Sequence, residues 1–247
     1  MNRPVKGYRN ALKTDLHLHT CDGSRETYIR YDACRLIDAA MEKGYDVISI
    51  TNHDTVTYSD YLQDYARERG IVLIPGMEIT LQGRHVLSYH STRSPVPVSS
   101  FAELQKNKSP DTLYMAPHPF YPGGCSLGRR FLQWGRLFDA VELSHFYTNA
   151  INFNRKAIDA AESLNLPLVG TSDSHTLRQL NTTYSLVYAE KTAEAVLAAV
   201  KSGRVDIVTA PLSVCDLAMI VQEMLFSSSV KKAGAACVAL LSLLTRS

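Results

Sequence analysis

The sequence lacks any run of five like charges, and its formal net charge at pH 7 is only +2. Electrostatic attraction to DNA, RNA or anionic lipid is therefore not expected to dominate binding. No apolar run reaches the roughly 18 residues that a membrane span requires. The nearest stretch, 233–244, is too short, and the first ten residues contain no apolar segment typical of a signal peptide. We expect a soluble, cytoplasmic protein with no membrane partner.

Paired cysteine spacing is also missing. The five cysteines are odd in number and form no C-x-x-C motif, which argues against both a disulfide framework and a cysteine zinc site. Free thiols in a reducing compartment are the expectation. The cysteines are Cys21, Cys34, Cys125, Cys215 and Cys237.

The composition, with 45% hydrophobic and 20% charged residues, is that of an ordinary globular protein and excludes a disordered chain. Apolar runs of strand length alternate with segments of helical period. The predicted strands are 12–18, 46–51, 71–78, 84–89, 112–117, 139–143, 166–171 and 184–189. The predicted helices are 31–43, 59–69, 99–107, 150–165 and 193–202, the last capped by Thr192.

This alternation predicts a mostly parallel sheet covered by helices, either closed as a barrel or open and doubly wound. Residues 91–98 and 118–130 are rich in proline or glycine and are expected to be loops. After Pro211 the composition shifts toward Leu, Met, Ala and Ser, with two further helices predicted near 213–226 and 229–244. We therefore divide the chain into a main domain, 1–211, and a helical extension, 212–247. The extension either packs on the main domain or joins two copies as a homo-oligomer.

The histidines mark one end of the predicted sheet. Each lies at or just beyond the carboxyl end of a predicted strand, or in the following loop, and in parallel α/β folds those ends form the face that holds the active site. The eight are His17, His19, His53, His85, His90, His118, His145 and His175.

Two segments carry alternating ligand types. Asp15, His17 and His19 share one face of a strand because side chains alternate with a period of two. Asp173 and His175 repeat this spacing after the buried run L-P-L-V-G-T-S. Neighbouring imidazoles repel when protonated, so neutral, metal-bound histidines are the favoured interpretation.

Glu78 ends an almost uninterrupted apolar run, where a carboxylate must be paired with an arginine or bound to metal. A bridging carboxylate is the preferred role. His53 follows the buried run V-I-S-I, and Asp54 either caps the next helix or orients His53. His118 is held between two prolines.

Other positions leave alternatives open. His85 and His90 compete for one ligand role, at opposite ends of one strand, with His85 preferred. Asp22 is either an oxygen ligand or part of a turn. Glu142 is a ligand or an ion-pair partner, and His145 contacts substrate or simply packs.

Histidines mixed with carboxylates suit Zn, Mn, Fe or Co better than Mg or Ca. The ligands exceed what one tetrahedral ion can use, which indicates two or three divalent ions. Two ions a few Å apart can generate a bridging hydroxide and hold both the attacking and the leaving oxygen of a phosphoester.

Five ordered motifs in this chain resemble the PHP (polymerase and histidinol phosphatase) superfamily of metal-dependent phosphoesterases. The motifs are D-L-H-L-H-T at 15–20, I-T-N-H-D at 50–54, G-M-E-I-T at 76–80, A-P-H-P at 116–119 and S-D-S-H at 172–175. The resemblance implies a distorted (β/α)7 barrel, TIM-like, with a di- or trinuclear centre. Residues 116–183 look like a bacterial branch with a PHP-associated C-terminal region.

The resemblance further implies that Glu78 bridges two ions. One ion would be held by His17, His19, Glu78 and Asp173, and Glu78 would share a second with His118. His53 and His175 would belong to another ion, and His85 is favoured over His90. Asp22 matches the family's S-D-G turn only through a shortened loop.

We therefore expect a metal-dependent phosphoesterase that hydrolyses a small phosphate mono- or diester by attack of a metal-bridging hydroxide. Asp173, His175 and Asp54 are the predicted catalytic residues. Predicted substrate contacts are Arg129, Arg130, Arg178 and His145, because guanidinium groups match phosphate oxygens. The alternatives are a nuclease acting on oligonucleotide ends, which the near-neutral charge disfavours, and a non-catalytic metal-binding regulatory module.

Overall fold

The computed structural model describes residues 11–26, 28–96 and 98–227. The strands are β1 (Leu12–Leu18), β2 (Val47–Ile50), β3 (Val72–Leu73), β4 (Gly76–Leu81), β5 (Arg84–His90), β6 (Thr112–Ala116), β7 (Ala140–Ser144), β8 (Leu168–Thr171), β9 (Thr183–Val187) and β10 (Val205–Thr209). The helices are α1 (Ala33–Glu42), α2 (Asp60–Glu68), α3 (Phe101–Lys106), α4 (Arg129–Trp134), α5 (Asn154–Leu164), α6 (Ala193–Lys201) and α7 (Val214–Ser227), with a 3-10 turn η1 (Gly135–Leu137).

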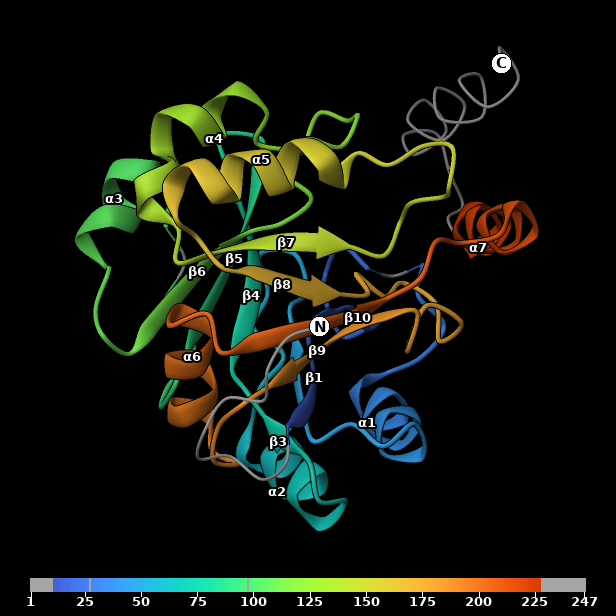
Figure 1. Cartoon of the computed structure of the whole chain (residues 1–247). Coiled ribbons are helices and arrows are strands. Elements are labelled where there is room, and N and C mark those ends of the chain that lie inside the picture. Colours follow the sequence, from blue (N-terminus) through green and yellow to red (C-terminus); the bar gives the residue numbers. More distant parts are fainter. Residues whose placement is uncertain (1–10, 27, 97, 228–247) are drawn as a thin grey trace.

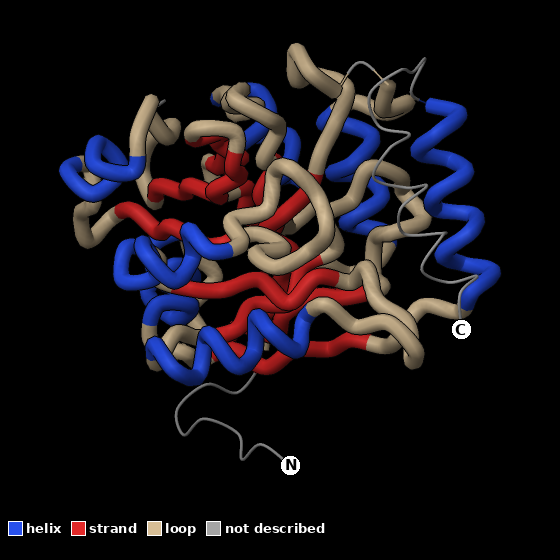
Figure 2. Tube along the Cα trace, turned by 90° about the horizontal axis from the view of Figure 1, so that it is seen from above, coloured by secondary structure: helices blue, strands red, loops and turns tan. Residues whose placement is uncertain are grey.

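The strands form two five-stranded sheets with helices outside them (Figures 1 and 2). One has the order β10-β9-β1-β2-β3 and the other β4-β5-β6-β7-β8. The prediction of a mixed α/β fold is confirmed. The prediction of a mostly parallel sheet is wrong, because four of the eight described strand pairs are antiparallel. These pairs are β4 with β5, β5 with β6, β9 with β1 and β10 with β9. Strand pairing does not close the described sheets into one barrel.

The two sheets meet at two junctions near the carboxyl ends of the strands. At the first, the backbones of His53 and Glu78 form an isolated parallel β-bridge, and Asp54 N donates to Glu78 O at 2.9 Å. At the second, His19 N donates to Ser174 O at 3.0 Å and Ser174 N donates to His17 O at 3.3 Å. These backbone bonds bring four of the ligand-bearing segments together.

Three apolar clusters fill the molecule beneath this end. One packs strands of both sheets against α6, through Val196, Leu197 and Val200. A second packs the β4–β7 sheet against α3, α4 and α5, and a third packs β1 and β2 against α1. Because the strands are anchored in packed apolar surface, their polar ends are held rigidly.

Local sequence signals explain most of the helices. Side chains of Asp32, Ser59, Ser100 and Thr192 accept hydrogen bonds from the backbone at the amino ends of α1, α2, α3 and α6. Gly44, just past α1, has φ +71°, a conformation that glycine adopts without strain. No described helix is long and apolar enough to cross a membrane.

Sequence patterns missed β10 and α4. They also fused β3 and β4, which belong to different sheets and are separated by Ile74 and Pro75. The helix predicted near 213–226 is α7, whereas 229–244 lies outside the described residues. Helix α7 packs through a small apolar cluster of its own with Phe146, and the boundary at 211/212 stays a prediction.

Candidate metal centre

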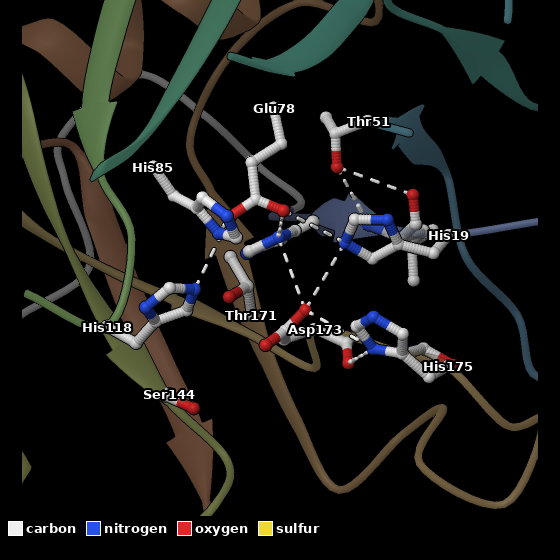
Figure 3. Close-up of polar contacts among 12 residues, drawn as sticks. His19, Thr51, Glu78, His85, His118, Ser144, Thr171, Asp173 and His175 are labelled. Atoms are coloured by element: carbon white, nitrogen blue, oxygen red, sulfur yellow. Dashed lines mark hydrogen bonds and ion pairs between the residues drawn. The ribbon is translucent and has the colours of Figure 1, made fainter. Parts of the chain in front are cut away.

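The predicted ligands converge at the end of the molecule where the two sheets meet (Figure 3). Glu78 lies in the middle, with His85 and His118 on one side and His19 on the other. Three groups of side chains have ligand atoms within 4.8 Å of one another: His17, His19 and Asp173; His19, His53 and Glu78; and Glu78, His85 and His118.

Glu78 joins two of these groups through different oxygens. Its Oε2 lies 3.3 Å from His17 Nε2, 3.3 Å from His19 Nε2 and 3.1 Å from His53 Nε2. Its Oε1 lies 2.8 Å from His85 Nδ1 and 3.4 Å from His118 Nε2. The carboxylate is 1% exposed. The two oxygens of this one carboxylate therefore face different sets of imidazoles.

Asp173 closes the centre on the side opposite Glu78. Its Oδ1 lies 3.2 Å from His17 Nε2 and 3.3 Å from His19 Nε2, and 3.6 Å from His175 Nδ1. Its backbone has φ +45°, a strained conformation for a residue other than glycine.

Acceptors behind three of the rings engage Nδ1, and in His17 and His53 this leaves Nε2 facing Glu78. Glu142 Oε1 lies 2.6 Å from His17 Nδ1, and Glu26 Oε1 lies 2.6 Å from His53 Nδ1. The carbonyl of Asp173 lies 3.0 Å from His175 Nδ1. In each neutral ring Nδ1–H donates to its acceptor, so Nε2 keeps a lone pair for a cation.

The amide of Gln179 holds the turn that carries Asp173 and His175. Its Oε1 accepts from His175 N at 2.9 Å and from Thr176 N at 2.8 Å. Its Nε2 donates to Asp173 O at 3.1 Å and to His145 Nε2 at 3.2 Å. Gln179 is buried, so these bonds form out of reach of bulk water.

Several buried atoms at the centre have no hydrogen-bond partner in the described part of the chain. They include both ring nitrogens of His19, Oε1 of Glu78 and Nδ1 of His85. Glu78 Oε1 and His85 Nδ1 are only 2.8 Å apart, yet their orientation makes no hydrogen bond. Buried polar atoms are rarely left unpaired, and lone pairs aimed at a common point are what a cation requires. The residues therefore fit divalent metal ions.

The charges of the centre support this fit. Burial alone would raise the pKa of Glu78 and Asp173, but the surrounding imidazoles hold both pKa values well below their usual range. Burial would lower the pKa of His19, but Asp173, Glu26 and Glu78 raise it to about 10. The centre thus concentrates negative charge that protons or metal ions must neutralise.

Three predicted or considered positions lie away from the cluster. Asp22 is exposed, and its Oδ2 accepts from Ala33 N at 2.8 Å at the start of α1. Asp54 pairs with Arg25 at 2.7 Å and accepts from Thr80 N at 2.6 Å. His90 bonds to Arg93 Nε at 2.9 Å. Each of these side chains is already occupied, because its loop or strand end turns it toward other partners.

Of the remaining candidates, Glu142 and His145 lie at the centre or next to it, whereas the three arginines have other partners or are exposed. Glu142 contacts His17, and His145 is buried against Gln179, next to the Asp173 turn. Arg178 pairs with Glu223 of α7 at 3.0 Å, and Arg130 donates to Gln82 at 2.7 Å. Arg129 is exposed at the first residue of α4. The substrate contacts assigned to these arginines stay predictions.

Glu26 and Gln179 are the site residues that sequence reasoning missed. Glu26 lies in a loop seven positions beyond His19, and it is fully buried because the turn near Gly23 folds it back under His53. A Cβ on Gly23 would lie 2.0 Å from Glu26 Oε2, so this glycine marks the close approach. Gln179 carries no charge and belongs to no motif, and only its buried contacts identify it.

Comparisons with known proteins agree with the motifs. Residues 152–205 match the family model described as PHP-associated, which confirms the resemblance to the PHP superfamily. An uncharacterized protein of Methanocaldococcus jannaschii is 26% identical over 144 residues, covering 55% of this chain and 83% of its own.

Solved structures share the fold at low identity. PsfC from Pseudomonas syringae superposes with a TM-score of 0.61 at 18% identity, over 90% of this chain and 100% of its own. A provisionally assigned metal-dependent phosphoesterase from Bifidobacterium adolescentis gives 0.52 at 14% identity, over 90% and 98%. An amidohydrolase from Chromobacterium violaceum, with bound sulfate and no metal, gives 0.51 at 14%, over 66% and 87%.

Proposed function

We propose that this PHP-like chain is a metal-dependent hydrolase, specifically a phosphoesterase acting on a small phosphate mono- or diester. The observation that carries the proposal is the position of Glu78, whose two oxygens face separate groups of histidines. A carboxylate shared in this way suits two adjacent divalent ions, Mn, Zn or Fe. Such ions, when bound, supply positive charge to phosphate oxygens and lower the pKa of water.

The side chains of this chain would divide the work. His17, His19, His53, Glu78, His85, His118 and Asp173 would hold the ions, and His175 would offer Nε2 to an ion or a proton. In hydrolysis a water oxygen forms a bond to phosphorus, the ester P–O bond breaks, and the leaving alcohol takes a proton. Glu26 and Glu142 would keep the imidazoles in the ligating tautomer throughout.

The proposal includes a distorted (β/α)7 barrel. It is supported by the two junctions, where backbone bonds join the loop after β2 to β4 and the end of β1 to the loop after β8. It also includes a reducing, cytoplasmic setting, which fits the free thiols of the four described cysteines. Partners beyond a small phosphorylated substrate are not proposed.

The test is a hydrolysis screen on the purified protein after loading with Mn, Zn or Fe. The substrates are sugar phosphates, mononucleotides, histidinol phosphate and a single-stranded oligonucleotide. We expect phosphate release from a small ester, with the Asp173→Ala variant reduced at least about 100-fold, since it loses a group shared by two histidines.

The matched control is Asp22→Ala, which removes a carboxylate outside the cluster and should keep full activity. Metal-loaded protein that hydrolyses none of these esters would count against a phosphoesterase. Unchanged rates in Asp173→Ala would support the non-catalytic module instead. Hydrolysis confined to the oligonucleotide would support the nuclease.

A further inference from the structure

A cavity of about 450 Å³ lies directly beside the metal centre. His175 belongs to both, since its ring stacks on His19 at 4.3 Å between centroids and also lines the cavity. The other walls come from the segment before α1, from α1, from the loop after β8 and from α7. They are Arg30, Tyr31, Arg35, Thr176, Leu177, Gln222 and Glu223.

Two arginines give this cavity a cationic wall. The guanidinium of Arg30 has no hydrogen-bond or ion-pair partner in the described ranges. Arg35 lies 3.6 Å from Glu42, with both side chains more than half exposed, at 53% and 62%. An exposed pair of this length contributes little, so both guanidinium groups are available to a ligand.

The opposite wall does not cancel this charge. Glu223 lines the cavity, but Arg178 Nε lies 3.0 Å from its Oε1 and neutralises it. Gln222 adds an amide that can bond to hydroxyl groups, and Leu177 adds apolar surface. The cavity therefore combines a positive wall, neutral polar groups and an apolar patch next to the ligands of the metal centre.

We propose that this cavity binds a second anionic group, a carboxylate or phosphate, on the organic part of the substrate, with Arg30 as its main contact and Arg35 as its second. This deepens the proposed function and rests on it. A substrate with its ester phosphate at the metal centre enters the cavity past His175. The volume falls within the roughly 300–1,000 Å³ typical of small-molecule sites and is too small for a folded macromolecule.

The test compares three aryl phosphates built on the same benzene ring: phenyl phosphate, 4-carboxyphenyl phosphate and 1,4-phenylene bisphosphate. We expect the wild-type KM for each ester with a second anionic group to be about tenfold below the KM for phenyl phosphate, because a charge-assisted contact to that group strengthens binding. Arg30→Gln should remove this preference and leave the KM for phenyl phosphate unchanged. The two anionic esters separate carboxylate from phosphate recognition.

Binding of two phosphonates that cannot be hydrolysed, benzylphosphonate and 4-carboxybenzylphosphonate, is measured in parallel by calorimetry on the metal-loaded protein. The matched control is Arg67→Gln, an exposed arginine of α2 whose side chain is 72% exposed. Equal binding of the two phosphonates, or a preference that survives Arg30→Gln, overturns the proposal. The wild-type protein could hydrolyse no ester and still bind 4-carboxybenzylphosphonate more tightly than benzylphosphonate. If Arg30→Gln then removes this preference, the subsite stands and the phosphoesterase assignment falls.

Discussion

Single hydrogen bonds decide whether an imidazole at this centre can bind a cation. His53 and His17 each direct Nδ1 to a buried carboxylate, Glu26 or Glu142, and their Nε2 atoms both approach Glu78 Oε2. A neutral ring has one lone pair, so the acceptor behind the ring determines where that lone pair points. Glu26 and Glu142, which accept from these Nδ1 atoms, therefore set the orientation of the lone pairs at the centre.

Replacing Glu26 by Gln should weaken metal binding by about 10- to 100-fold, the usual effect of losing a partner behind a ligand. An amide can present its NH₂ to His53 and so favour the other tautomer. The measurement is calorimetric titration of metal-free protein with Mn²⁺. Asp22→Asn, an exposed carboxylate in the same loop, is the control, and equal affinities in the two variants would refute the role given to Glu26.

Gln179 offers a second test at this scale, because it positions Asp173 and His175 without touching the centre. Gln179→Glu keeps the size of the side chain and the acceptor for His175 N, but it loses the donor to Asp173 O. We expect Mn²⁺ affinity to fall about tenfold. The unfolding midpoint of the metal-free variant should also fall, because a buried carboxylate oxygen would face the carbonyl oxygen of Asp173. An unaltered titration curve would show that the turn holds its shape without this amide.

Most of the ligand set could be predicted from the sequence because ligand position follows strand position. His17, His19, His53, Glu78 and His118 all come at or just after the end of an apolar run, and such ends meet at one face. Glu26 escaped because a loop that folds back has no periodicity. Asp22, three residues after His19, was considered as an oxygen ligand or a turn residue, and in the structure its side chain accepts a hydrogen bond from Ala33 N.

At the scale of elements, close backbone approach determines where Glu78 lies. Gly76 opens β4, and a Cβ there would lie 2.2 Å from Ser49 Oγ and 2.9 Å from Thr51 Cγ2 of the neighbouring chain segment. The absence of a side chain lets β4 lie against β2 and its following loop, and Glu78 is two residues further on. The sequence predicted one strand over 71–78, whereas contact with two sheets divides it, a tertiary effect that no local pattern contains.

Gly76→Ala should therefore lower the free energy of unfolding by about 1–3 kcal/mol, the usual cost of overpacking a tight contact. It should also weaken metal binding, since β4 carries Glu78. Urea unfolding and Mn²⁺ titration measure the two effects. Gly124→Ala is the control because a Cβ there meets nothing within 4 Å. Equal stability of the two variants would mean that β4 can shift without cost.

At the scale of the whole molecule, the metal centre lies where the two sheets meet. His17, His19 and His53 belong to one sheet or to its loops, whereas Glu78, His85, His118 and Asp173 belong to the other or to its loops. Ions held by both sets would link the sheets at the ends where their described strand pairing is incomplete. An unfolded chain does not assemble such a site, so binding free energy adds to the stability of the fold.

Mn²⁺ at 100 times its dissociation constant should raise the free energy of unfolding by about 2.7 kcal/mol, and chelation should reverse the gain. At one fixed Mn²⁺ concentration, the gain should be larger at pH 8 than at pH 6. Burial lowers the pKa of His17 and His118, but nearby carboxylates outweigh it and raise both, so metal must displace protons that are bound more fully at the lower pH. Thermal unfolding with Mn²⁺ and with chelator at each pH measures the gain in the free energy of unfolding. Asp173→Ala should abolish this gain. A gain that is independent of pH would mean that the imidazoles are already free of protons, and that carboxylates alone balance the charge of the centre.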